Sequence, residues 1–355
     1  FMWRFDSPKQ QVGRDLLGLL DPESPVYGAW DQAIDRFERT VFSLELNKPT
    51  LIEWANSQVT LEDEADVREL RLGAAHCFQQ SIELLQGMQM MTDREEAPAR
   101  LGAIHHHIGN VMGLIGERSG SIHFLEQAAL SYEQALELQT QESAPEEWAR
   151  TKMNMGVVMQ AIGVLEDDTG MLKQALQSYK DAVNVLPRED APAEWAAAMQ
   201  TVGTVLYQLG THRRGARTLE QSVVAFRNAL SERSQDEDTL AWAVSHNNLA
   251  ATMQAVGEHE EDIGALEACI SAYDQVLKVI SAEQYPLVAA MISANRASAM
   301  SALAGESDYL DMAEAACAEF DRLSALFAET SYENYCRAAQ ARAEAAREIV
   351  SALQV

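Results

Sequence analysis

The chain has 355 residues, 47% of them hydrophobic, which is enough to bury a core in two ordinary domains or in one elongated repeat array. Its formal net charge is −27, and a surface this acidic repels phosphate backbones and anionic lipids, so we expect no nucleic-acid partner. No segment approaches the roughly 20 apolar residues that span a bilayer, so we expect no membrane insertion either.

The acidity has two interpretations. In the simpler one it keeps a long array soluble, and in the other it reflects a preference for a basic protein or peptide partner. The four cysteines are far apart and form no CxxC pair, which favours a reducing, cytoplasmic location. The segment after Met2, which we expect to be the native start, has no apolar stretch typical of a signal peptide.

The N-terminal region, residues 1–68, is helical in pattern but has no repeat register, and we leave it unassigned. Residues 69–96 are interpreted as a divergent, partial repeat, because Phe78 and Ser81 align with Tyr132 and Ala135 of a later helix. An incomplete repeat would expose an apolar helix face. Covering that face could produce a homodimer or admit a helix from a partner.

Residues 97–327 repeat with a period of 47 residues. Five types of position keep this interval, each with its own chemistry. They are the tryptophans Trp148, Trp195 and Trp242; the glycines Gly109, Gly156 and Gly203; a second glycine series of Gly116, Gly163, Gly210 and Gly257, followed after 48 residues by Gly305; the aromatics Tyr132, Tyr179, Phe226, Tyr273 and Phe320; and the small residues four positions before them.

Each unit is predicted to contain two helices. In one unit the first helix starts at Pro145 and ends at Gly163, where glycine could provide a left-handed C-terminal cap. The second starts near Met171 with apolar residues at helical spacing and ends before Pro187. The chain is therefore predicted to be all-α.

These residues resemble the tetratricopeptide repeat family. The unit containing Gly156 has its signature: an apolar–Gly pair and a large residue in the first helix, then Ala175, Tyr179 and a closing proline. The long period is similar to that of a subgroup common in bacterial proteins. The resemblance implies a right-handed α-solenoid of antiparallel helix pairs, with five repeats in residues 97–327 and a capping helix in residues 328–355. It also implies a non-enzymatic scaffold or adaptor for protein–protein interaction.

The resemblance further implies that the first helices line a concave face that binds a peptide or a partner helix. Asn and Gln side chains both donate and accept hydrogen bonds, so a series of them could pair with a peptide backbone. Equally, these side chains could simply hold neighbouring helices together. The candidate residues are His106, His107, Asn110, Arg150, Asn154, Gln160, Gln200, Thr201, Thr204, Tyr207, Asn247, Asn248, Gln254 and Asn295.

Three consecutive histidines, His105, His106 and His107, do not form a convincing metal site, because successive helical residues point about 100° apart. We expect them on the surface or in the groove. No catalytic motif is recognisable, so we expect no enzyme activity, no metal and no cofactor. Two alternatives stay open: a small-molecule sensor with a pocket near His106, His107 and Asn110, or a non-catalytic subunit of an enzyme complex.

Overall fold

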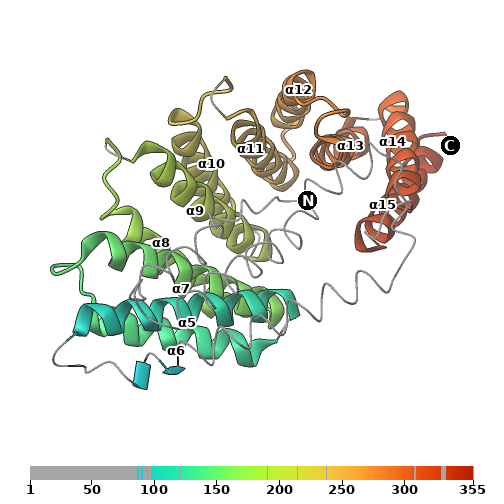
Figure 1. Ribbon diagram of the computed structural model, residues 1–355. Coiled ribbons are helices and arrows are strands. Elements are labelled where there is room, and N and C mark those ends of the chain that lie inside the picture. Colours follow the sequence, from blue (N-terminus) through green and yellow to red (C-terminus); the bar gives the residue numbers. More distant parts are fainter. Residues whose placement is uncertain are drawn as a thin grey trace. The chain divides into compact units, whose positions relative to one another are not determined.

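The described elements of the computed structural model are all α-helices (Figure 1). The structure describes residues 86–87, 89–90, 94, 97–119, 121–189, 191–213, 215–236, 238–307, 309–328 and 333–354. The helices are α5 Pro98–Ser119, α6 Ile122–Leu138, α7 Pro145–Leu165, α8 Thr169–Val183, α9 Pro192–Arg213, α10 Ala216–Ser231, α11 Thr239–Glu260, α12 Ile263–Val279, α13 Pro286–Ser307, α14 Leu310–Ala328 and α15 Glu333–Leu353. The region predicted to be unassigned, residues 1–68, and the aligned Phe78 and Ser81 lie outside the described residues.

The described residues divide into two compact units, one within Asp6–Ala198 and the other within Met199–Val355. Within each unit, consecutive helices pack against one another: α5 with α6 and α7 with α8 in the first, and α11 with α12 and α13 with α14 in the second. Short connections reverse the chain between the members of a pair. The all-α solenoid of antiparallel helix pairs is therefore confirmed as the fold class.

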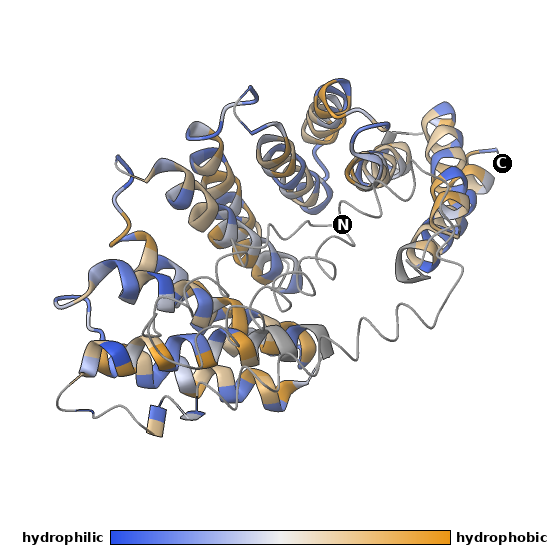
Figure 2. Cartoon of the chain, viewed as in Figure 1, coloured by the Kyte–Doolittle hydropathy of each residue, from blue (hydrophilic) through white to orange (hydrophobic). Residues whose placement is uncertain are grey.

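The long helices start at evenly spaced positions, namely Pro98, Pro145, Pro192, Thr239 and Pro286. Proline suits a first helical turn because its missing N–H would have no partner there. Thr239 replaces the proline, and the preceding Asp238 accepts a 2.9 Å hydrogen bond from the N–H of Ala241. The connections between helices contain hydrophilic residues, as between α10 and α11 (Figure 2).

Glycine allows the long helix of a pair to approach the aromatic ring of the short one. A Cβ added to Gly109 would lie 2.5 Å from Cε1 of Tyr132, and one added to Gly156 would lie 2.5 Å from Cε1 of Tyr179. The aromatic rings are almost fully buried. These residues are therefore glycine because no larger side chain leaves room for the ring.

The second glycine series is not the helix cap that the sequence suggested. Gly163 lies inside α7, is buried, and faces the side chain of Leu172 at 3.0 Å from its would-be Cβ. The left-handed residue is Asp167, with φ 55°, and the N–H of Asp168 donates to the carbonyl of Gly163 at 2.9 Å. This is a Schellman ending in which the non-glycine Asp167 takes the αL position.

Asp168 also starts the next helix. Its side chain accepts a 2.6 Å hydrogen bond from the N–H of Gly170, so α8 begins at Thr169 rather than near Met171 as predicted. Glu261, with φ 54°, and Asp262 repeat the arrangement between α11 and α12. One aspartate therefore serves both helices of a pair.

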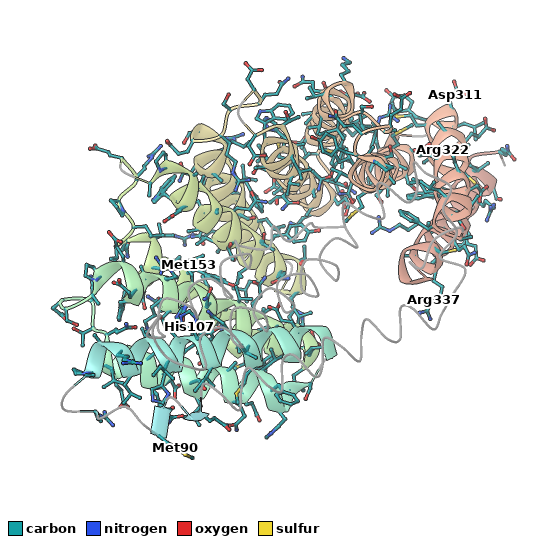
Figure 3. The ribbon with its side chains drawn as sticks, in the orientation of Figure 1. Met90, His107, Met153, Asp311, Arg322 and Arg337 are labelled. Atoms are coloured by element: carbon teal, nitrogen blue, oxygen red, sulfur yellow. The ribbon has the colours of Figure 1, made fainter. Side chains whose placement is uncertain are left out.

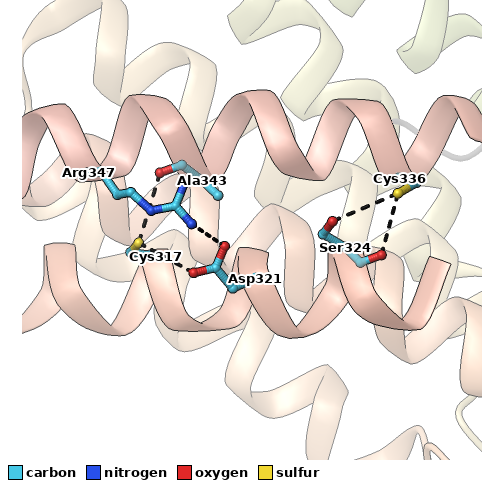
Figure 4. Close-up of polar contacts among 6 residues, drawn as sticks. All are labelled: Cys317, Asp321, Ser324, Cys336, Ala343 and Arg347. Carbon is cyan, nitrogen blue, oxygen red and sulfur yellow. Dashed lines mark hydrogen bonds and ion pairs between the residues drawn. The ribbon is translucent and has the colours of Figure 1, made fainter. Parts of the chain in front are cut away.

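The final helix, α15, packs its alanines on α14 and α13. Ala343 and Ala346 are fully buried in the core that contains Phe320, and their small side chains allow close contact. At its edge, Arg347 pairs with Asp321, and the Sγ of Cys317 lies 3.9 Å from the carbonyl oxygen of Ala343 (Figure 4). Cys317 is only half-buried, so it belongs to the edge of this interface rather than to the core.

None of the helices in the described ranges is long and apolar enough to cross a membrane.

Replacing Gly156 with alanine tests the close approach of α7 and α8. The added methyl group would lie 2.5 Å from the ring of Tyr179, which is fully buried and has little room to move. We expect the free energy of unfolding to fall by about 1–3 kcal/mol because of overpacking. Urea unfolding followed by circular dichroism measures the loss, and hydrogen exchange assigns it to α7 and α8.

The matched control is Gly305→Ala, within α13. Its added methyl group meets nothing within 4 Å, so only the gain in helix propensity remains. We expect stabilisation of up to about 1 kcal/mol. Destabilisation by both substitutions, or by neither, would show that the aromatic contact does not determine the cost at Gly156.

Candidate functional site

The three consecutive histidines of α5 are buried, at 6%, 8% and 6% exposure, so of the expected locations, on the surface or in the groove, the surface is wrong. They lie where α5 meets both α6 and α7, and His107 is labelled on α5 in Figure 3. The Nδ1 of His106 lies 2.8 Å from the hydroxyl of Thr151 on α7. That hydroxyl already donates to the carbonyl of Glu147 at 2.8 Å, so Nδ1–H of His106 is the donor.

Burial favours the neutral form of His105 and His106. Desolvation, assisted by His107 and Arg150, lowers the pKa of His106 from 6.5 to about 3. Desolvation also lowers the pKa of His105, assisted by Arg94 and opposed by Glu137. A neutral, hydrogen-bonded His106 is a link between α5 and α7 rather than a proton-transfer group poised near pH 7.

An amide joins the same helices one turn further along. The side-chain oxygen of Asn110 on α5 accepts from the hydroxyl of Tyr132 at 2.8 Å and from the side-chain nitrogen of Asn154 on α7 at 2.8 Å. In the next pair, the hydroxyl of Tyr179 donates to the side-chain oxygen of Gln160 at 3.0 Å. Both tyrosine hydroxyls are therefore satisfied by the long helices.

The predicted site residues of the Asp6–Ala198 unit differ in accessibility. Arg150 is exposed, and Asn110 and Asn154 are half-buried, so these are available to a ligand at least in part. The buried members of the predicted set in this unit are His106, His107 and Gln160.

The Met199–Val355 unit separates the predicted residues in the same way. Thr201, Tyr207 and Gln254 are half-buried. The buried members are Gln200, Thr204, Asn247, Asn248 and Asn295.

The buried amides bond to one another across neighbouring long helices. The side-chain nitrogen of Asn295 donates to the side-chain oxygen of Asn247 at 2.9 Å, and Asn247 in turn donates to Asn248 at 3.1 Å. The side-chain oxygen of Gln200 accepts from Ser245 at 2.9 Å. These bonds join α13 to α11 and α11 to α9, which supports the stacking interpretation for the buried members of the set.

Tyr273 of α12 breaks the pattern of satisfied tyrosines. Its side chain is fully buried, yet its hydroxyl has no hydrogen-bond partner among the described residues. In the 47-residue period, Ala251 is equivalent to Asn110, the residue that bonds to Tyr132. Gln254 is equivalent to Gln160, the residue that bonds to Tyr179, but the side-chain nitrogen of Gln254 donates to Glu258 at 2.7 Å.

Arg342 of α15 donates to the hydroxyl of Ser298 on α13. Burial lowers the pKa of Arg342, and the negative charge of Glu258 opposes that shift. Desolvation raises the pKa of Tyr273 well above 10, so its hydroxyl keeps its proton.

Of Gln254, Glu258, Tyr273, Ser298 and Arg342, only Gln254 was predicted as a site residue. Tyr273 belongs to the aromatic series that was interpreted as packing, although the replacement of the asparagine partner by Ala251 is visible in the sequence. Arg342 lies in the C-terminal segment, which has no repeat register to align. The loss of a partner for Tyr273 could have been found by comparing equivalent positions of the repeats, whereas the role of Arg342 could not.

The described residues offer no group of three or more metal-ligating side chains, and Cys269 is a core residue as expected. Its Sγ donates to the carbonyl of Leu266 at 3.0 Å, and burial raises its pKa to about 12. A thiol held protonated in this way is a poor nucleophile.

No family model and no curated protein sequence matches this chain. Among solved structures, it is similar to a circular tandem repeat protein with novel repeat topology and enhanced subunit contact surfaces, at 14% identity over 97% of this chain and 96% of that chain, with a TM-score of 0.32. Another comes from the computational design of self-assembling cyclic protein homooligomers, at 14% identity over 79% of this chain and 94% of that chain, with a TM-score of 0.12. Scores this low carry no argument, and the fold class rests on the helices of the chain itself.

Stability is expected to fall in mild acid because of His106. The folded pKa of about 3 lies below the unfolded value of 6.5, so the unfolded state binds the extra proton. The contribution of His106 is therefore complete above pH 6.5 and is lost as the pH falls, by about 2 kcal/mol at pH 5. Urea unfolding of the wild type and His106→Gln at pH 7.5 and pH 5 should show a smaller pH difference for the variant.

Exposed His123 on α6 of the same unit gives the control. The variant His123→Gln should keep the pH difference of the wild type. An unchanged pH difference in His106→Gln would contradict the assignment to the buried ring.

Tyrosine-to-phenylalanine substitutions should separate bonded from unbonded hydroxyls. In Tyr179→Phe the acceptor of Gln160 loses its donor, so we expect a loss of about 1–2 kcal/mol in the free energy of unfolding. In Tyr273→Phe a buried hydroxyl without a partner is removed, so the stability should stay within about 0.5 kcal/mol or increase. Equal losses in urea unfolding would indicate that Tyr273 is also bonded within the fold.

Proposed function

We propose that the chain is a non-enzymatic, cytoplasmic scaffold or adaptor of the tetratricopeptide type that binds a peptide or a partner helix across its long helices. The observation that carries the proposal is the partial exposure of polar side chains at matching positions of successive long helices. Tyr207 on α9 and Gln254 on α11, both in the Met199–Val355 unit, are such a pair. Side chains that recur in this way can contact an extended ligand at several points.

The family assignment is part of the proposal. It is supported by the long helices, which start 47 residues apart from Pro98 to Pro286, and by the glycine–aromatic contact that recurs from Gly109 to Gly203. The buried amides serve the stack, so the candidate binding residues are the exposed and half-buried members of the predicted set in each unit. They are Asn110, Arg150 and Asn154 in the Asp6–Ala198 unit, and Thr201, Tyr207 and Gln254 in the Met199–Val355 unit.

The partner is expected to be a protein or peptide, with a basic segment favoured by the net charge of −27. Homodimer formation stays a second possibility. Its predicted origin, the partial repeat around Phe78, lies outside the described residues.

The test compares truncations on the two kinds of helix. The double variant Arg150→Ala, Thr201→Ala removes accessible side chains from α7 and α9, and Lys173→Ala, Arg227→Ala removes exposed ones from α8 and α10. A partner captured by the wild type and then purified should bind the first variant at least about tenfold more weakly, because contact residues often contribute more than 1 kcal/mol. The second variant should bind as the wild type does.

Circular dichroism should show both double variants folded, since none of the four side chains is buried. If the α8 and α10 variant loses the partner and the α7 and α9 variant keeps it, the binding surface belongs to the short helices. If neither variant changes the affinity, the partner contacts another part of the chain and the proposed surface is wrong.

A further inference from the structure

Three residue pairs, about one helical turn apart, form a joint between α5 and α7. They are His106 with Thr151, Asn110 with Asn154, and Gly113 with Val158. The first two pairs are hydrogen bonds of 2.8 Å, and the third is a contact to which α5 contributes no side chain. We call this set the α5–α7 joint. Because these residues bury little apolar surface between the two helices, the joint depends on its hydrogen bonds.

The helices within each pair are held in a different way. A glycine of the long helix meets an aromatic ring of the short one, at Gly109 and Tyr132 in the first pair and at Gly156 and Tyr179 in the second. Neither contact involves a group that gains a charge in mild acid. The two pairs are linked to each other by the α5–α7 joint and by the packing of α6 on α7. A change that weakens the joint therefore acts between the pairs and not within them.

The equivalent joint of the Met199–Val355 unit is made by a glutamine. Two periods of 47 residues further along the chain, Gln200 of α9 replaces His106 and Ser245 of α11 replaces Thr151. The hydroxyl of Ser245 donates to the side-chain oxygen of Gln200 at 2.9 Å, and both side chains are buried. A side chain that does not titrate therefore links two long helices at this position. The hydrogen bond does not require an imidazole, and what His106 adds is the capacity to take up a proton.

The surroundings of His106 disfavour a positive charge. Its ring is buried, and its centroid lies 5.8 Å from that of Tyr132 on α6, whose pKa is raised by burial so that it stays uncharged. Desolvation is the main cause of the low pKa of His106, and His107 of α5 and Arg150 of α7 add to it. The imidazolium form is therefore more stable in water than in the joint.

His105 adds to the sensitivity of α5 to acid. Desolvation lowers its pKa, the charge of Arg94 adds to this shift, and Glu137 of α6 opposes it. Arg94 and Glu137 form an exposed ion pair of 3.2 Å, so this carboxylate already has a cation beside it. Exposure of α5 to water therefore favours uptake of a second proton.

We propose that the α5–α7 joint is an acid-sensitive switch, in which uptake of a proton by His106 releases the α5–α6 pair from α7 while the other described helix pairs stay folded. The joint is complete above pH 6.5 and weakens as the pH falls, because the released ring binds a proton that the buried ring excludes. A helix pair without its neighbour is only marginally stable in water, so the released pair exposes its backbone amides. The release also breaks the bond between Asn110 and Asn154, and its consequence for a partner rests on the proposed function.

The test is hydrogen exchange of the full chain, followed by mass spectrometry between pH 7.5 and pH 5 and corrected for the intrinsic pH dependence of exchange. Protection of the amides of α5 and α6 should fall by at least about thirtyfold, because one proton binds with a pKa of 6.5 after release and about 3 before it. Protection in α7, in α8 and in the helices of the Met199–Val355 unit should change by less than about threefold. The measurement needs no partner, so its outcome is separate from that of the proposed function.

Two variants identify the group that takes up the proton. His106→Gln introduces the side chain that Gln200 has at the equivalent position, so protection of α5 and α6 should match the wild type at pH 7.5. The fall at pH 5 should be smaller than in the wild type by about thirtyfold. His123→Gln removes an exposed histidine from α6 and should keep the fall of the wild type.

Four results would overturn the proposal. Protection of α5 and α6 could be the same at both pH values, or it could fall equally in all the described helices, in which case acid unfolds the chain as a whole. If His106→Gln keeps the fall of the wild type, another group takes up the proton. If His106→Gln has already lost protection at pH 7.5, the joint requires an imidazole, which contradicts its equivalence to the joint made by Gln200.

Discussion

The contact between a helix glycine and an aromatic ring sets the geometry of each helix pair. At Gly156 the ring of Tyr179 lies 2.5 Å from where a Cβ would be, so the two backbones approach more closely than a larger side chain would allow. The ring therefore passes close to the long helix, and its para position lies near polar side chains of that helix. The same residue both packs against the long helix and can form a hydrogen bond with it. A hydroxyl at this position therefore affects the hydrogen bonding of the helix pair as well as its packing.

The aromatic series shows how one packing position can take on different roles. Phenylalanine at 226 only fills space, whereas tyrosine at 179 fills the same space and bonds to Gln160. At 273 the ring still fills the space, but the potential partner Gln254 has turned to Glu258. Because the ring maintains the pair in every case, the hydroxyl and its surroundings can vary without loss of the fold. A repeat array can acquire a local site in this way.

The sequence predicted the helix pairs well because the residues that define them recur at fixed intervals and act locally. The start of α7 at Pro145 agrees with the structure, and the start of α8 differs by two residues because Asp168, rather than a later residue, caps it. The role of Gly163 and the burial of His106 could not be predicted from spacing, since both depend on which neighbouring helix covers the position. Arg342 was missed because its partners lie far away in the chain, and no period connects them to it.

The turn between α7 and α8 is formed by residues that serve two helices at once. Asp168 donates its N–H to the end of α7 and accepts with its side chain at the start of α8, while Asp167 makes the left-handed step between them. An inserted residue would break both connections, so this turn has a fixed length. In the connection from α8 to α9, the described residues 184–189 and 191 include no side chain that bonds to both helices. In evolution, and in engineering, such an array should therefore gain or lose length by whole helix pairs, with variation in length confined to the joints between them.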